Sequence, residues 1–158
     1  MGTIKDHLKQ IADLTKGSNQ SEYNERRYNL AHEVEIVSVK EVLTENEIRL
    51  IKSQIKPKCK ECYKNATLFT SMFDATFVSG QMEVCGFGID HAFNKIRGKY
   101  IDITAEFALS DKGIKTSSEY VSIAEYSRDE VMKAMLDMGC YDDPFRYYFV
   151  TKVLGRSW

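Results

Sequence analysis

The stretch CYKNATLFTSMF, residues 62–73, predicts the central helix of the fold. Ala66, Phe69 and Phe73 recur at helical spacing, so they share one side of that helix. Pro57 and a short polar link precede Cys62, which places this cysteine at the N-terminus of the helix. Residues 75–87, 89–96 and 99–104 follow as strand-like segments.

Helices are also predicted on the N-terminal side of this centre. Apolar residues recur at helical spacing over 4–14, and a more polar helix is expected over 21–31. The alternating, β-branched segment 33–42 predicts a strand. Thr44 and Glu47 form a capping box, which opens a helix that ends before Pro57.

The C-terminal part of the sequence also contains a strand segment and helix-capping residues. Residues 120–126 predict a strand, and Ser127 with Glu130 forms a second capping box. The helix that follows ends at Gly139. Asp142 or Asp143 is expected to cap a last helix, whose aromatic residues are interpreted as core.

This order of elements predicts an α+β domain. The helix that carries Cys62 is expected to pack on an antiparallel sheet, with helices at both ends of the chain. A length of 158 residues predicts a single domain. Within it, residues 1–50 form an N-terminal extension of helices and a strand, and residues 57–135 form the core.

The composition favours an ordinary globular protein of nearly balanced charge. The formal net charge is −1, which gives no electrostatic case for nucleic acid or an anionic membrane. The basic run 56–60, KPKCK, is interpreted as solvated surface. No apolar run approaches the ~20 residues that span a bilayer, and the first residues, MGTIKDHLKQ, do not resemble a signal peptide. A cytoplasmic location is therefore expected, and no nucleotide-binding glycine motif indicates a cofactor.

The segment HAFNKIRGKYIDIT, residues 91–104, predicts a hairpin that brings His91 to Asp102. If Arg97 and Gly98 form a two-residue loop, then Ile96 lies opposite Lys99 and the pairing continues along both strands. His91, Phe93, Asp102 and Thr104 then share one face of the sheet. His91 and Asp102 become diagonal neighbours, with Cα atoms roughly 7–8 Å apart.

Cys62 has three interpretations at this point. As a thiolate at a helix N-terminus facing His91, it would be a nucleophile, with Asp102 orienting the imidazole. As half of the CxxC pair with Cys59, it would be a zinc or redox cysteine. A zinc site needs further ligands, for which only Cys85, Cys140 or His91 are available. As a small apolar residue, it would be part of the core.

Four short motifs resemble those of the transglutaminase-like and papain-like cysteine superfamily. They read CYKNA (62–66), VSG (78–80), HAFN (91–94) and DIT (102–104), and they are most similar to those of a group of small uncharacterised bacterial and phage proteins. Phe93 stands where that group has tryptophan, and Ser79 stands where it has glutamate. The resemblance covers roughly residues 57–135.

The resemblance implies a cysteine-dependent hydrolase or acyltransferase with Cys62, His91 and Asp102 as its catalytic residues. The substrate would be an amide, isopeptide or thioester bond in a protein or peptide, and neither a cofactor nor a metal would be required. The family also contains members without activity. The alternative is therefore a catalytically silent interaction or inhibitor protein on the same fold, encoded by a phage and directed at a host system.

Overall fold

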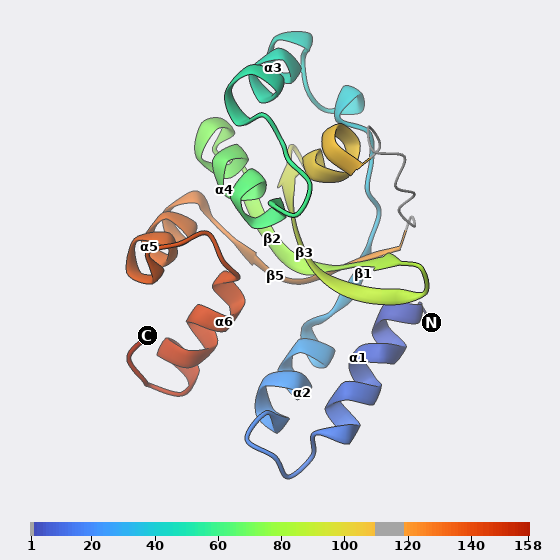
Figure 1. Ribbon diagram of the computed structural model, residues 1–158, viewed down its shortest axis with the longest axis vertical. Helices are drawn as coiled ribbons and strands as arrows, with labels where there is room; N and C mark the ends of the chain where they lie inside the picture. Colours follow the sequence, from blue (N-terminus) through green and yellow to red (C-terminus); the bar gives the residue numbers. More distant parts are fainter. Residues whose placement is uncertain (1, 110–118) are drawn as a thin grey trace.

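The computed structural model describes residues 2–109 and 119–158, and its centre is a curled five-stranded sheet (Figure 1). The strands are β1 (His32–Val34), β2 (Thr76–Val84), β3 (Phe87–Ile96), β4 (Lys99–Ile101) and β5 (Tyr120–Tyr126). They lie in the order β1-β5-β2-β3-β4, and every neighbouring pair is antiparallel. The consecutive strands β2, β3 and β4 form a meander, and β5 returns to the other edge of β2.

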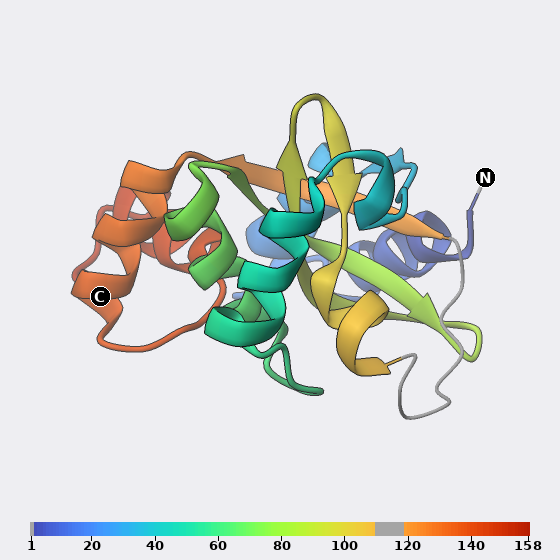
Figure 2. The same ribbon diagram turned by 90° about the horizontal axis from the view of Figure 1, so that it is seen from above.

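Helices flank the sheet at both ends of the chain (Figures 1 and 2). They are α1 (Thr3–Leu14), α2 (Ser21–Leu30), α3 (Glu45–Leu50), α4 (Cys62–Phe73), α5 (Arg128–Met138) and α6 (Pro144–Tyr148). Wider or tighter helical turns follow at Val39–Glu41, Ile51–Ile55, Ala105–Leu109 and Phe149–Val153. This arrangement confirms the predicted α+β class.

The predicted helix boundaries are set by local capping. Thr44 and Ser127 each accept a hydrogen bond from the amide three residues on, and Glu47 and Glu130 reach back, so both capping boxes are formed. Helix α4 begins at Cys62 and packs against β3 and β2. The central helix of the sequence analysis is thus confirmed at both of its ends.

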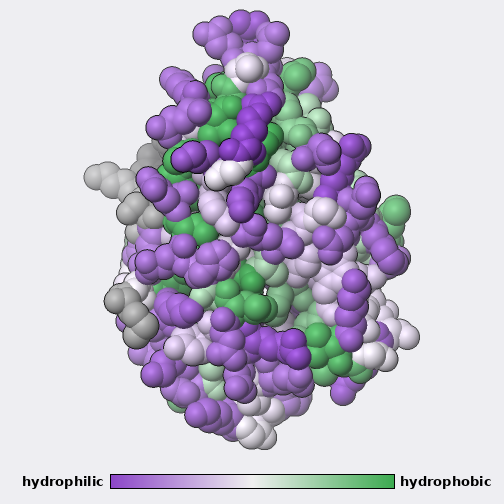
Figure 3. All heavy atoms as spheres, turned by 180° about the vertical axis from the view of Figure 1, so that it is seen from behind, coloured by the Kyte–Doolittle hydropathy of each residue, from purple (hydrophilic) through white to green (hydrophobic). Residues whose placement is uncertain are grey.

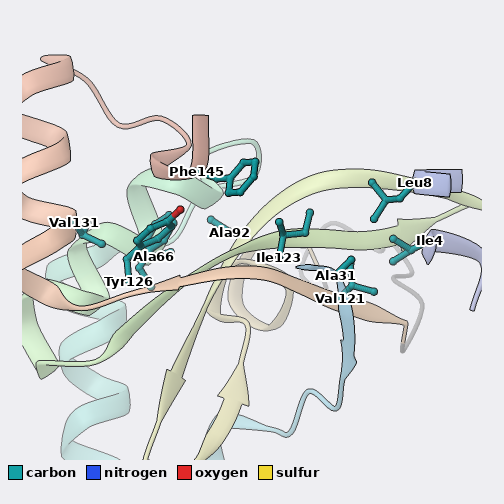
Figure 4. Packing of buried hydrophobic residues seen from close by; sticks show 11 residues of the cluster. Ile4, Leu8, Ala31, Ala66, Ala92, Val121, Ile123, Tyr126, Val131 and Phe145 are labelled. Carbon is teal, nitrogen blue, oxygen red and sulfur yellow. The ribbon is translucent and has the colours of Figure 1, made fainter. Parts of the chain in front are cut away.

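The core is built from three clusters of buried side chains. In the first, Ile4 and Leu8 of α1 pack with sheet residues, and Ala66 of α4 lies near Tyr126 and Val131 (Figure 4). The second joins α3, α4 and the β3–β4 hairpin, and the third lies around Phe93 and Tyr120. The N-terminal extension therefore contributes to the main core. Seen from behind, the surface is mostly hydrophilic, with separate apolar patches (Figure 3).

The strand predicted over 33–42 is wrong beyond Val34. Ile36 makes one isolated bridge to Tyr100, and Ser38 then caps a tight helical turn that buries Val39. The Val39 amide donates to Glu106 Oε1 at 3.0 Å instead of joining a strand ladder. The alternating pattern thus belongs to an irregular segment in which Val39 is buried and the other valines and Ile36 are half-buried.

The strand predicted over 99–104 ends early, at Ile101. Asp102 accepts a hydrogen bond from the Ala105 amide at its side chain and from the Glu106 amide at its carbonyl oxygen. These two bonds start a helical turn directly after the strand. Thr104 therefore does not lie opposite His91, as the extended hairpin had required.

Candidate active site

The β3–β4 hairpin has the predicted register. Ile96 lies opposite Lys99, Lys95 opposite Tyr100, and Asn94 opposite Ile101. Arg97 and Gly98 form the loop with φ of 53° and 78°, as a two-residue turn of this twist requires. The Arg97 guanidinium donates to both carboxylate oxygens of Glu47, at 3.0 and 2.7 Å, which anchors the hairpin to α3.

This register brings His91 and Asp102 into direct contact. His91 Nε2 lies 2.7 Å from Asp102 Oδ2, and both side chains are buried. Asp102 is the first residue after β4. It therefore lies close enough to the strand to remain the diagonal neighbour of His91, although it is outside the strand itself. The predicted neighbourhood of the two side chains is confirmed.

Two further bonds fix the Asp102 carboxylate. Its Oδ1 accepts from the Ala105 amide at 3.1 Å, and its Oδ2 also accepts from the Tyr120 hydroxyl at 2.7 Å. Tyr120 comes from β5 and is itself buried, and its ring lies near those of His91 and Phe93. Nothing in the sequence spacing singles out Tyr120, because its contact with Asp102 depends on where β5 enters the sheet.

The surroundings of the buried pair favour a protonated His91 and an ionised Asp102. Burial acts to raise the pKa of Asp102, but the charge of His91 and the three hydrogen bonds outweigh it and hold this pKa below its usual value. Burial acts to lower the pKa of His91, but the charge and hydrogen bond of Asp102 raise it overall, with a smaller contribution from Cys62. An imidazolium beside a carboxylate is thus stabilised inside the protein.

Cys62 is the first residue of α4 and is half-buried. Its side chain lies close enough to His91 to help raise the pKa of that histidine. Because His91 Nε2 binds Asp102, Nδ1 is the ring nitrogen left for another partner. No side chain caps α4, since the N-cap residue Glu61 makes no capping hydrogen bond. The first amides of α4 therefore point toward the surroundings of the thiol.

Two buried asparagines hold α4 in place against the hairpin. Asn65, one turn after Cys62, donates from Nδ2 to the Lys58 carbonyl at 3.0 Å and to Thr104 Oγ1 at 2.9 Å. The two N–H groups of Asn94 Nδ2 are shared among three acceptors, the carbonyl oxygens of Ala66 and Thr76, at 3.1 and 3.2 Å, and Thr70 Oγ1 at 3.0 Å. Both asparagines lie in the quoted motifs, and together they determine where Cys62 lies relative to His91.

The VSG motif has a structural explanation on the neighbouring strand. Gly80 lies opposite His91, and a Cβ at this position would come within 2.0 Å of the Val121 carbonyl oxygen, where β2 and β5 shift register. Ser79 donates to Asp143 Oδ1, and Asp143 caps α6 through the Phe145 amide. Burial raises the pKa of Asp143 above its usual value, partly offset by these two bonds. Ser79 thus connects the sheet to α6, away from the imidazole.

The cysteines form no metal site in the described ranges 2–109 and 119–158. No group of three or more histidine, cysteine or acidic side chains there could hold an ion. Cys59 packs beside the cluster around Phe93, and Cys85 and Cys140 are exposed. All four cysteines are free thiols, and only Cys62 interacts with a histidine that an aspartate also binds.

Comparisons with known proteins returned no match: no family model fits the chain, and no curated protein or solved structure is significantly similar to it. The resemblance to the cysteine superfamily therefore depends on the short motifs alone. In the part of the chain that the structure describes, no helix has the length and apolar character needed to cross a bilayer.

Proposed function

We propose that the protein is a cysteine-dependent hydrolase or acyltransferase that attacks an amide, isopeptide or thioester carbonyl through Cys62. The observation that carries the proposal is the grouping of three side chains: Cys62 lies near enough to His91 to influence its pKa, and His91 binds the fully hydrogen-bonded Asp102. The motifs support assignment to the transglutaminase-like and papain-like superfamily. A free thiol nucleophile suits a reducing compartment such as the cytoplasm.

The reaction would proceed in two transfers. The thiol proton passes to His91 Nδ1 before the attack, which gives a Cys62 thiolate beside the imidazolium that Asp102 stabilises. The Cys62 sulfur then forms a bond to the carbonyl carbon of the substrate. The imidazolium then gives that proton to the departing amine or thiol as its bond to carbon breaks. Water or an amine next attacks the acyl-enzyme, loses a proton to His91, and releases the thiolate of Cys62. Asp102 stays charged throughout and holds the ring with Nδ1 toward the sulfur.

The N-terminus of α4 would stabilise the charge that develops on the substrate oxygen. Its first amides have no side-chain cap, and they belong to the same turn as Cys62. Amide donors of this kind contribute most when they are already fixed before the reaction. Asn65 supplies the rigidity, because it binds the loop before α4 and the turn after β4 at the same time.

Site-resolved alkylation tests the proposed nucleophile. Cys62 should react with iodoacetamide near pH 7 at least about tenfold faster than Cys140, although Cys140 is more exposed, because only Cys62 has a proton acceptor beside it. Mass spectrometry of the digested protein after timed exposure gives the rate at each site. Equal rates at Cys62 and Cys140 would refute the nucleophile.

One observation favours an interaction protein on the same fold. The His91–Asp102 pair is almost fully buried, and Asp102 also caps the turn after β4, so the pair satisfies a structural need without any reaction. In that case Cys62→Ser should leave the biological effect intact. In the enzyme, the same change removes the nucleophile and abolishes the effect while the fold persists.

A further inference from the structure

Four exposed lysines lie close to Cys62 along the chain. Lys56, Lys58 and Lys60 alternate along the segment that leads into α4, Lys64 lies in its first turn, and all four are exposed. The only acidic residue between positions 56 and 64 is Glu61. This segment is strongly basic although the whole chain has a net charge of −1.

The basic segment is held close to the thiol. The Lys58 carbonyl accepts from the Glu61 amide at 3.3 Å and from Asn65 Nδ2 at 3.0 Å, so the loop folds back over the first turn of α4. Cys59 packs inward beside the Phe93 cluster, while the lysines on either side of it remain exposed. Lys60 adopts a left-handed conformation with φ of 67°, which tightens this turn two residues before Cys62.

Nearby carboxylates do not neutralise these lysines. Asp90, Asp142 and Asp143 influence the neighbouring Tyr63 hydroxyl electrostatically. Asp90 pairs with Arg27, Asp143 accepts from Ser79 and the Phe145 amide, and Asp142 accepts from the Asp143 amide. No salt bridge to Lys56, Lys58, Lys60 or Lys64 occurs among the described residues.

We propose, as an extension of the proposed function, that the acyl group delivered to Cys62 belongs to an acidic peptide segment. The ammonium groups of the loop would bind its carboxylates and hold the reacting carbonyl at the thiol. Lysines bind anions as separate point charges, so several of them along one segment suit the spaced carboxylates of an extended acidic peptide, whereas arginine adds bidentate recognition of a single phosphate. No arginine lies between positions 56 and 64. The substrate is therefore a peptide with several carboxylates near the bond that reacts.

Two alkylating reagents test the charge preference without knowledge of the natural substrate. Iodoacetate and iodoacetamide both form a bond from the Cys62 sulfur to carbon and release iodide, but only iodoacetate is an anion. Because both react with the thiolate, the ratio of their rates isolates the effect of local charge. Lys58→Glu combined with Lys60→Glu should lower the ratio of the iodoacetate rate to the iodoacetamide rate about fivefold at low ionic strength. The effect should largely disappear near 1 M salt, where the screening length is about 3 Å.

The matched control changes the net charge by the same amount elsewhere. Lys9→Glu combined with Lys16→Glu alters exposed lysines on and just after α1, which lies apart from α4 in Figures 1 and 2. This variant should keep the wild-type ratio. A ratio that is unchanged in the Lys58/Lys60 variant, or lowered equally in both variants, overturns the proposal. Slow reaction of Cys62 with iodoacetamide would instead refute the nucleophile, so the two failures are distinguishable.

A protection experiment separates carboxylates from phosphate. A short polyglutamate peptide should slow the alkylation of Cys62 by iodoacetamide in the wild-type protein and have little effect in the Lys58/Lys60 variant. Inorganic phosphate at the same ionic strength should protect less. Equal or stronger protection by phosphate would assign the lysines to a phosphorylated ligand and would reject the acidic peptide.

Discussion

The two carboxylate oxygens of Asp102 interact with three groups. Oδ1 accepts from the Ala105 amide and so starts the turn after β4, while Oδ2 accepts from His91 and Tyr120. The structure shows that one carboxylate both starts the turn after β4 and binds the imidazole of His91. The pair contributes stability only while both charges exist. That contribution is lost as the pH falls through the lowered pKa of Asp102, and again as the pH rises through the raised pKa of His91.

Asp102→Asn should slow the alkylation of Cys62 by roughly a hundredfold near pH 7. The asparagine oxygen can still accept from the Ala105 amide, so the fold is retained. Its amide group, however, would donate to His91 Nε2 and leave the ring proton on Nδ1, where it blocks transfer from the thiol. Rates from mass spectrometry and an unchanged circular dichroism spectrum provide the measurement. A rate within about twofold of wild type would show that Asp102 does not act on Cys62 through His91.

Tyr120→Phe provides the matched comparison at the same carboxylate. It removes one donor to Asp102 Oδ2 but leaves the charge of Asp102 and its bond to His91. We expect the alkylation rate of Cys62 to fall no more than about tenfold. A loss as large as that of Asp102→Asn would mean that orientation of the carboxylate, and not its charge, determines the reactivity of the thiol.

At the scale of elements, the ion pair between Arg97 and Glu47 connects the hairpin that carries His91 to α3. The hydrogen bond from Arg97 lowers the pKa of Glu47 from 4.5 to about 2, with further help from the Thr44 amide. A carboxylate with a lowered pKa in the folded state stabilises the protein above its unfolded pKa, and the stabilisation is lost as the pH falls toward the folded value. The hairpin anchor should therefore weaken between about pH 4.5 and pH 2.

Glu47→Gln isolates this pair, because glutamine can still accept from the Thr44 amide and keep the capping box. Wild type should be more stable than the variant near pH 7, and the difference should shrink toward zero as the pH approaches 2. Urea unfolding of both proteins across this range measures it. A difference that stays constant with pH would show that the Arg97–Glu47 contact is not electrostatic in its effect.

At the scale of the whole molecule, we expect α1 to unfold together with the site, because it packs on the same sheet. Leu8 is 1% exposed and belongs to the same buried cluster as the sheet residues Val121 and Ile123, and the Ile4 amide donates to Glu119. Leu8→Ala should lower the free energy of unfolding by about 2–5 kcal/mol. Urea unfolding followed at once by circular dichroism and by the accessibility of Cys59 should give one shared transition. Separate transitions would show that the N-terminal helices fold independently.

How much the sequence predicted depends on the distance along the chain between the interacting residues. The capping boxes and the hairpin register were predicted because each follows from residues within a few positions of one another. The contacts of Asn65 with Thr104 and of Asp102 with Tyr120 were not, since they join segments 39 and 18 residues apart. The strand predicted over 33–42 failed because the apolar alternation there reflects burial against other elements rather than pairing.

The hydrogen bond from Tyr120 to Asp102 has a consequence for the order in which the site forms during protein synthesis. A ribosome makes Cys62, His91 and Asp102 before it makes β5, so an emerging chain contains the thiol, the imidazole and the carboxylate without the strand that fixes the last of them. During synthesis, the Cys62 thiol would therefore stay unreactive until residues 120–126 had joined the sheet. Under the proposed function, the chain would gain its reactivity only after β5 has joined the sheet, which would spare the unfinished chain and its neighbours on the ribosome from premature reaction.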